Sequence, residues 1–275
     1  MNECFGHNFM LNGELQQSEF FDNSLIYEGE SIYEVIRLIR GTPVFFFDHM
    51  DRLMKSFHLQ KKTPLADIKT IRRMILSLTR SDRKKEVNLK LVFNFKNGNG
   101  NWLVYYVDSI YPSDEQIRKG VRGILFNAER SNPESKVINH KLRTSIYQKL
   151  IIERGYEALL VNDSNFITEG SRSNVFFIKG ESLITAPDSM ILSGITRKQI
   201  ISICEENRIR VEFRCINAEE IADCDAAFMT GTSPMVLPFN SIGNHKFEIR
   251  QPVMEWLREQ YLIKVDNSIR NFRFQ

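Results

Sequence analysis

The sequence lacks three features that would each indicate a particular class of protein. Its four cysteines show no paired spacing, so they support neither a disulfide framework nor a metal site. No segment approaches the ~20 apolar residues that a membrane-spanning helix needs. The amino terminus has no basic start followed by an apolar run. We therefore expect a cytoplasmic protein with no membrane partner.

The charge is nearly balanced along the chain. The 275 residues include 37 Lys and Arg and 34 Asp and Glu, which gives a formal net charge of +3. The two signs are interspersed along the chain. Because no basic face is concentrated, nucleic acid is not an expected partner, although a small anion could still bind. A hydrophobic content of 42% is that of a soluble globular protein, and the length suits one large domain or two ordinary ones.

The first part of the chain predicts a sheet with helices. Asn12-Gly13 supplies the positive φ angles of a tight hairpin turn, and the alternating residues 31–39 predict a strand. A turn at 41–43 leads into a second apolar run at 44–47. From Asp48, which we expect to cap the first turn, the apolar spacing becomes helical. We further expect a helix over 66–80 and a strand pair over 88–95 and 102–107.

A polar stretch at 111–115 marks the expected boundary between two domains, which we place at 1–113 and 119–275. No internal repeat or low-complexity tract appears. Beyond the boundary we expect strands at 121–126, on both sides of Glu169, at 182–185, 211–215 and 226–229, and helices at 142–153, 196–206 and 253–262.

Residues 167–177, Ile-Thr-Glu-Gly-Ser-Arg-Ser-Asn-Val-Phe-Phe, place a carboxylate at a polar corner between two apolar strands. This string resembles the signature of the class IV, or fold-type IV, pyridoxal-phosphate aminotransferases. That family includes D-amino-acid aminotransferase, branched-chain aminotransferase and 4-amino-4-deoxychorismate lyase. The matching residues are Glu169, Gly170, Ser171, Ser173, Asn174, Val175 and Phe176.

The resemblance implies a fold, a cofactor and a reaction. The fold is α+β, with a small N-terminal α/β domain and a larger β-rich C-terminal domain, in a homodimer. The cofactor is pyridoxal 5'-phosphate. The reaction transfers an amino group between an amino acid and a 2-oxo acid. Pyridoxal phosphate needs a lysine to hold it, an acid beside the pyridine nitrogen and donors for the phosphate.

Two lysines compete to hold the cofactor. The family's lysine lies some thirty-odd residues before the signature Glu and is often followed at the third place by Asn. Lys136 lies 33 residues before Glu169 and is followed by Asn139, whereas Lys141 lies 28 residues before it and lacks the Asn. We therefore predict Lys136 as the catalytic lysine, the alternative being that either lysine is a solvated surface charge.

Further roles follow by resemblance. Glu169 contacts the pyridine nitrogen and favours the protonated ring. Tyr33 lies in Tyr-Glu-Val-Ile-Arg, which resembles a strand of D-amino-acid aminotransferase, and we count it as catalytic. Arg52, within His-Met-Asp-Arg-Leu, contacts the cofactor phosphate, for which a guanidinium is well suited.

Two later motifs complete the predicted phosphate site. Gly194-Ile195-Thr196 opens a helix whose first amides can bind an anion. By resemblance, Leu192 underlies the cofactor ring, Ile195 and Thr196 offer amides, and Thr232 is a hydroxyl donor. No metal is expected.

Substrate choice departs from the family pattern. The family's carboxylate-binding arginine usually lies in the loop that corresponds to 96–101, and this loop has no arginine. Arg172 stands where D-amino-acid aminotransferase has a serine. Two other functions remain open: the lyase and a cofactor-binding protein without turnover. Against the lyase, Val35 stands where that enzyme has a threonine that relays a proton.

Overall fold

The computed structural model describes residues 3–274. Contacts divide this chain into two compact units, each described by itself. The first unit comprises the described residues up to Ile110, the short segment Ser135–Ile138 and the described residues from Val265 onward. The second comprises Tyr111–Glu134 and Asn139–Lys264. Whether 1–113 and 119–275 fold as separate domains stays a prediction.

The first unit is built on a six-stranded sheet in the order β2-β1-β6-β5-β3-β4. All of its neighbouring strands are antiparallel. The predicted hairpin is confirmed, because Asn12 and Gly13 adopt φ angles of 51° and 93° between β1 and β2. The strands are β1 (Asn8–Leu11), β2 (Glu14–Gln17), β3 (Glu30–Ile39), β4 (Thr42–Pro43), β5 (Val87–Lys96) and β6 (Asn99–Val107).

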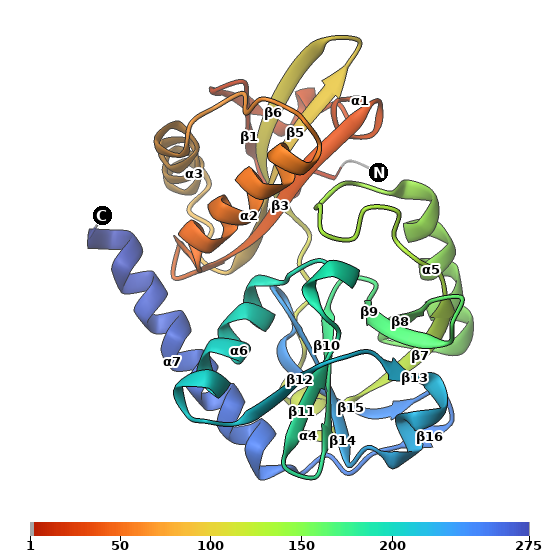
Figure 1. The fold of residues 1–275 in the computed structure, drawn as a ribbon. Helices are drawn as coiled ribbons and strands as arrows, with labels where there is room; N and C mark the ends of the chain where they lie inside the picture. Colours follow the sequence, from red (N-terminus) through yellow and green to blue (C-terminus); the bar gives the residue numbers. More distant parts are fainter. Residues whose placement is uncertain (1–2, 275) are drawn as a thin grey trace. The chain divides into compact units, whose positions relative to one another are not determined.

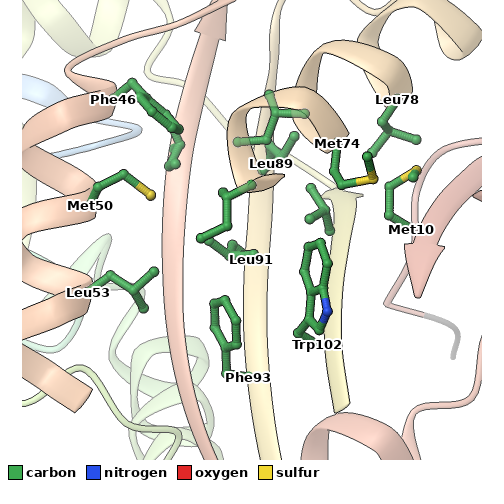
Figure 2. Packing of buried hydrophobic residues seen from close by; sticks show 14 of the residues in the cluster. Met10, Phe46, Met50, Leu53, Met74, Leu78, Leu89, Leu91, Phe93 and Trp102 are labelled. Carbon is green, nitrogen blue, oxygen red and sulfur yellow. The ribbon is translucent and has the colours of Figure 1, made fainter. Parts of the chain in front are cut away.

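Two helices, α2 (Phe46–Leu59) and α3 (Ile68–Asp82), pack on one face of this sheet. Their apolar stripes meet the inward residues of the central strands. In Figure 2, Met50 and Leu53 of α2 point toward Leu91 of β5, and Met74 of α3 belongs to the same cluster. The opposite face carries a second, smaller core that includes aromatic residues and the short α1 (Ser24–Tyr27).

The second unit holds a ten-stranded sheet in the order β12-β11-β10-β14-β15-β7-β8-β9-β13, with β16 paired to β15 (Figure 1). Its interior strands are buried on both faces, as near-continuous apolar runs predict. The strands are β7 (Val121–Asn127), β8 (Glu157–Val161), β9 (Phe166–Gly170), β10 (Asn174–Lys179), β11 (Ser182–Thr185), β12 (Arg210–Phe213), β13 (Ile216–Asn217), β14 (Ala226–Gly231), β15 (Met235–Ile242) and β16 (His245–Lys246).

Four helices complete the fold, and none of the helices within residues 3–274 is long and apolar enough to cross a membrane. The longest runs to Phe274, well past the predicted end at residue 262, because apolar residues recur at helical spacing through Tyr261, Val265, Ile269 and Phe272. The helices are α4 (Asp114–Lys119), α5 (His140–Glu153), α6 (Ile195–Glu206) and α7 (Pro252–Phe274).

One local prediction is wrong. The helix expected from Asp48 begins earlier, because β4 ends at Pro43 and α2 already begins at Phe46, within the apolar run 44–47. The residue before the helix is Phe45, with a φ of 50° and no side-chain cap, so Asp48 is not the cap but a residue of the first turn. Phe46 is 1% exposed, so the first residue of α2 is part of the core.

Candidate active site

Lys136 lies in a short segment that is fixed along the first half of β3, on the edge opposite β5. The amide of Tyr33 donates to the Lys136 carbonyl at 3.0 Å, and the amide of Ile138 donates to the Ser31 carbonyl at 3.1 Å. The Lys136 amide donates in turn to the hydroxyl of Ser56 in α2, at 3.2 Å. The backbone of this lysine is therefore held by both a strand and a helix of the first unit.

The two competing lysines differ in their surroundings. The ammonium nitrogen of Lys136 lies 4.7 Å from the centre of the Tyr33 ring, in cation–π contact, and its side chain is half-buried. Tyr33 itself is 6% exposed. Lys141 is exposed in the first turn of α5. Of the two, only Lys136 has the fixed, partly desolvated position in which a lysine can become reactive.

Arg52 belongs to a buried ionic network. Its Nε and one Nη donate to the two carboxylate oxygens of Glu34, at 2.8 and 2.7 Å. His49 contacts the same carboxylate through Nδ1, at 2.8 Å. Glu34 and His49 are 0% and 3% exposed. The residues meet because Glu34 points from β3 toward α2, and positions 49 and 52 share one face of that helix.

Electrostatics in this network favour a charged Glu34. Burial opposes the carboxylate, but Arg52 and His49 more than offset it and lower the pKa of Glu34 to about 2. Burial lowers the pKa of His49 below its ordinary value, although the Glu34 charge acts in the opposite direction. Arg52, predicted as a phosphate ligand, is thus neither solvated nor isolated, and its guanidinium is held in one orientation by a buried carboxylate.

Glu169 is the penultimate residue of β9 in the second unit and is 3% exposed. One carboxylate oxygen accepts from the Leu192 amide at 3.2 Å and lies 3.4 Å from the Asn174 side-chain nitrogen. The other lies 3.0 Å from Nε of Arg130, a distance that makes an ion pair although the two atoms are not aligned for a hydrogen bond. A buried carboxylate with these partners is held in place and charged.

Asn174 connects Glu169 to the loop that carries Leu192. Besides its contact with Glu169, its side-chain nitrogen donates to the Leu192 carbonyl at 2.8 Å. Gly194 allows this approach, because a Cβ there would lie 2.0 Å from the side-chain oxygen of Asn174. The predicted ring-contacting residue, Leu192, is therefore fixed to Glu169 both directly and through Asn174.

A second buried carboxylate, Glu157 of β8, organises the turn after Glu169. It accepts from the amide and hydroxyl of Ser171, at 3.1 and 2.6 Å, and from the Ser173 hydroxyl at 2.9 Å. Arg130 binds the Ser171 carbonyl at 2.8 Å. Glu157 thus fixes the hydroxyl-rich turn between β9 and β10 through neutral donors.

The predicted phosphate-binding residues of this unit lie at the start of α6 and the end of β14. Gly194 precedes α6 and no side chain caps the helix, so the first amides, including those of Ile195 and Thr196, are available to an anion. The Thr230 hydroxyl, 1% exposed, has no hydrogen-bond partner among residues 3–274. Thr232, half-buried, follows one residue after β14 ends.

Comparison with known proteins then assigns the chain to a family. The sequence pattern of the family described as "Amino-transferase class IV" matches residues 31–242. The chain belongs to the class IV aminotransferase family.

Relatives of known name resemble most of the chain. A D-alanine aminotransferase from Bacillus licheniformis is 27% identical over 231 residues, covering 78% of this chain and 79% of the relative. An aminodeoxychorismate lyase from Bacillus subtilis is 24% identical over 238 residues, covering 81% and 80%.

The fold is shared with a solved class IV structure. The branched-chain amino acid aminotransferase of Escherichia coli superposes with a TM-score of 0.82, at 20% identity, covering 94% of this chain and 95% of that one. The predicted α+β, fold-type IV architecture is thereby confirmed.

Within this class IV chain, the predicted site residues fall into two sets. Tyr33, Arg52 and Lys136 lie in the first unit, where the structure brings Tyr33 and Lys136 into contact. Glu169, Leu192, Ile195, Thr196 and Thr232 lie in the second, where Leu192 contacts Glu169 directly. No group of His, Cys, Asp and Glu that could hold a metal occurs in the part of the chain that the structure describes.

Sequence reasoning missed four residues that support these sets: Glu34, His49, Arg130 and Glu157. Strand alternation could have signalled the first, since it places Glu34 on the helix-covered face opposite Tyr33. Glu157, within an otherwise apolar strand, was a visible buried charge. No local pattern marks Arg130, because its partner Glu169 lies 39 residues away in the sequence.

Proposed function

We propose that the chain is a pyridoxal-phosphate-dependent aminotransferase that moves an amino group between an amino acid and a 2-oxo acid. The observation that carries this proposal is the position of Lys136. Its backbone is held at the edge of β3 and its ammonium group lies against Tyr33, whereas Lys141 is exposed. A reactive lysine needs such a fixed and partly desolvated amine.

The residues present fit pyridoxal phosphate. A buried, charged Glu169 suits a protonated pyridine nitrogen, and the uncapped start of α6 suits a phosphate. The Thr230 hydroxyl is a buried polar atom that a ligand oxygen could satisfy. When bound, the cofactor supplies an electron-withdrawing ring to the substrate's α-carbon.

Each protein group has its own task in this proposal. The amine of Lys136 holds the cofactor and moves the proton at the substrate's α-carbon. Tyr33 packs against that amine and restricts its position. Glu169 stabilises positive charge on the ring nitrogen, and Arg130 and the Leu192 amide orient its carboxylate. Arg52, Ile195, Thr196 and Thr232 are the proposed phosphate ligands.

The lyase is the alternative, since one similar protein is named an aminodeoxychorismate lyase. Val35, which stands where that enzyme's relay threonine is expected, has no hydroxyl and cannot carry a proton. It is also half-buried on the same strand as Tyr33. This favours amino transfer over carbon–carbon cleavage.

An amino-donor screen tests the function. Purified protein with pyridoxal phosphate is given D- and L-amino acids, with 2-oxoglutarate or pyruvate as acceptor, and the new amino acid is measured by chromatography. Turnover is expected in wild type and in Lys141→Ala, the matched control, but not in Lys136→Ala. Pyruvate release from aminodeoxychorismate without an acceptor would establish the lyase instead, and no reaction with any donor would leave a non-catalytic cofactor binder.

The homodimer and the cytoplasmic location stay predictions. Light scattering coupled to gel filtration decides the first directly, since the chain mass is 32.2 kDa and a dimer has twice that mass.

A further inference from the structure

Lys90 is a buried cation that has no role in the proposed reaction described above. It lies in the middle of β5 and is 3% exposed. Register pairs it with Val35 on one side and Tyr105 on the other, so it shares the sheet face of Tyr33. Its ammonium nitrogen is 5.4 Å from the centre of the Tyr33 ring and 5.9 Å from that of Tyr105. A lysine is rarely buried so completely unless it is paired.

The partner of Lys90 is a carboxylate from the start of the chain. Lys90 binds one carboxylate oxygen of Glu3, and the Tyr27 hydroxyl donates to the other. The nearby Tyr105 side chain is fully buried, and its hydroxyl interacts with the Glu3 carboxylate. Burial and the Glu3 charge raise the pKa of Tyr105 well above its ordinary value, so it stays a protonated donor. We call Lys90, Tyr27 and Tyr105 the carboxylate pocket.

The carboxylate pocket lies across Tyr33 from the proposed catalytic lysine. Segment 135–138 lies along one edge of β3, and β5 pairs with the other edge. The backbones of Lys136 and Lys90 are therefore two strand spacings apart, on the order of 10 Å. Both ammonium groups nevertheless contact the same tyrosine ring. A carboxylate bound by Lys90 would belong to the part of a substrate remote from the reacting nitrogen.

We propose that Lys90 binds the distal carboxylate of a dicarboxylic substrate, such as a five-carbon 2-oxo diacid, and that Glu3 occupies this place in the substrate-free protein. This inference rests on the proposed function of Lys136. Because a substrate carboxylate would replace the Glu3 carboxylate, Lys90 is paired both in the free protein and in the complex. Substrate binding therefore does not have to cover the cost of desolvating this cation. It also supplies a cation for substrate recognition in a chain whose 96–101 loop has no arginine.

Substrate selectivity tests the pocket. The ratio of kcat/KM for 2-oxoglutarate to that for pyruvate is measured in wild type, Lys90→Met and the control Lys96→Met, which removes an exposed lysine of the same strand. The ratio should fall in Lys90→Met by on the order of tenfold to a hundredfold, the value of a charge-assisted bond. It should not change in Lys96→Met. An unchanged ratio in Lys90→Met overturns the proposal.

Glu3→Gln separates an exchanging carboxylate from a purely structural ion pair. If Glu3 competes with substrate, this variant should lower KM for 2-oxoglutarate by several-fold without a matching change in kcat. A structural pair would instead lower thermal stability and leave this KM unaltered or raised, and that result would contradict the proposed exchange.

A binding test that needs no turnover completes the design. In Glu3→Ala with pyridoxal phosphate present, acetate should raise Tm above that in chloride at equal ionic strength, because it replaces the missing carboxylate on Lys90. The double variant Glu3→Ala/Lys90→Met should show no such difference. If acetate raises Tm equally in both variants, the proposed carboxylate pocket is refuted. If no amino donor reacts but acetate still stabilises only the variant that keeps Lys90, the aminotransferase function is refuted and the pocket is not.

Discussion

Removing Arg52 should destabilise the folded protein even when no cofactor is bound. Arg52→Met leaves the Glu34 carboxylate, which is fully buried, without its two guanidinium hydrogen bonds. Breaking a buried pair on one side costs about 3–5 kcal/mol. For a protein of this size, about 2–4 °C of Tm are lost per kcal/mol, so Tm should fall by roughly 6–20 °C. Urea unfolding followed by far-UV circular dichroism measures the free-energy change.

The double variant Arg52→Met/Glu34→Gln isolates the cause. With the carboxylate neutralised, the buried charge is gone, and coupling between the two sites should return at least ~1.5 kcal/mol of the loss. The reasoning is refuted if Arg52→Met costs less than ~1 kcal/mol, or if the two substitutions are simply additive.

The same pair of variants tests whether Arg52 touches the phosphate. If it does, single and double variants should both bind pyridoxal phosphate more weakly, by about 1.5–3 kcal/mol, and bind unphosphorylated pyridoxal as well as wild type does. If Arg52 acts only by pairing with Glu34, the double variant should recover its affinity for the phosphorylated cofactor.

Four further outcomes are expected. Glu169→Gln should retain the cofactor but lose most activity, because a neutral amide cannot hold the ring nitrogen protonated; near-normal kcat would remove that role. Thr232→Ala should weaken the binding of pyridoxal phosphate by ~1 kcal/mol in spectroscopic titrations, which is less than the effect of losing Arg52. An effect as large as that of the Arg52 substitution would contradict this ranking. Stability should fall as the pH drops below about 6.5, because the folded pKa of His49 lies below its unfolded value and the unfolded chain binds the proton more tightly. Acidification should remove further stability below pH ~4.3 as the lowered pKa of Glu34 is approached, and urea midpoints that do not change from pH 8 to 3 would contradict both assignments.

Elements with strong patterns could be predicted from the sequence, and those set by distant packing could not. The alternation at 31–39 and the Asn-Gly turn are local signals, and β3 and the first hairpin appear where they indicate. The start of α2 falls within the apolar run at 44–47, where Phe46 packs in a core with residues from distant parts of the chain, so local spacing could not place it. The continuation of α7 to Phe274 likewise depends on tertiary packing of its last turns.

For the candidate site, motifs identified the residues but not their contacts. The spacing of Lys136 and Glu169 was visible in the sequence, whereas the partners of Arg52 and Glu169 were not. Glu34 reaches Arg52 only because β3 and α2 pack together, and Arg130, which follows β7, meets Glu169 only because β7 and β9 belong to the same sheet. The strand pattern around Lys90 carries no sign of its pairing with Glu3, which lies 87 residues earlier in the chain.

The central claim, that Lys136 is the lysine that carries the cofactor, can be tested by a single labelling measurement. Wild-type protein saturated with pyridoxal phosphate is reduced with borohydride, digested and mapped by mass spectrometry. The account predicts a phosphopyridoxyl group on the peptide that contains Lys136 and none on Lys141. A label on Lys141 instead, or the absence of any specific label, would contradict it.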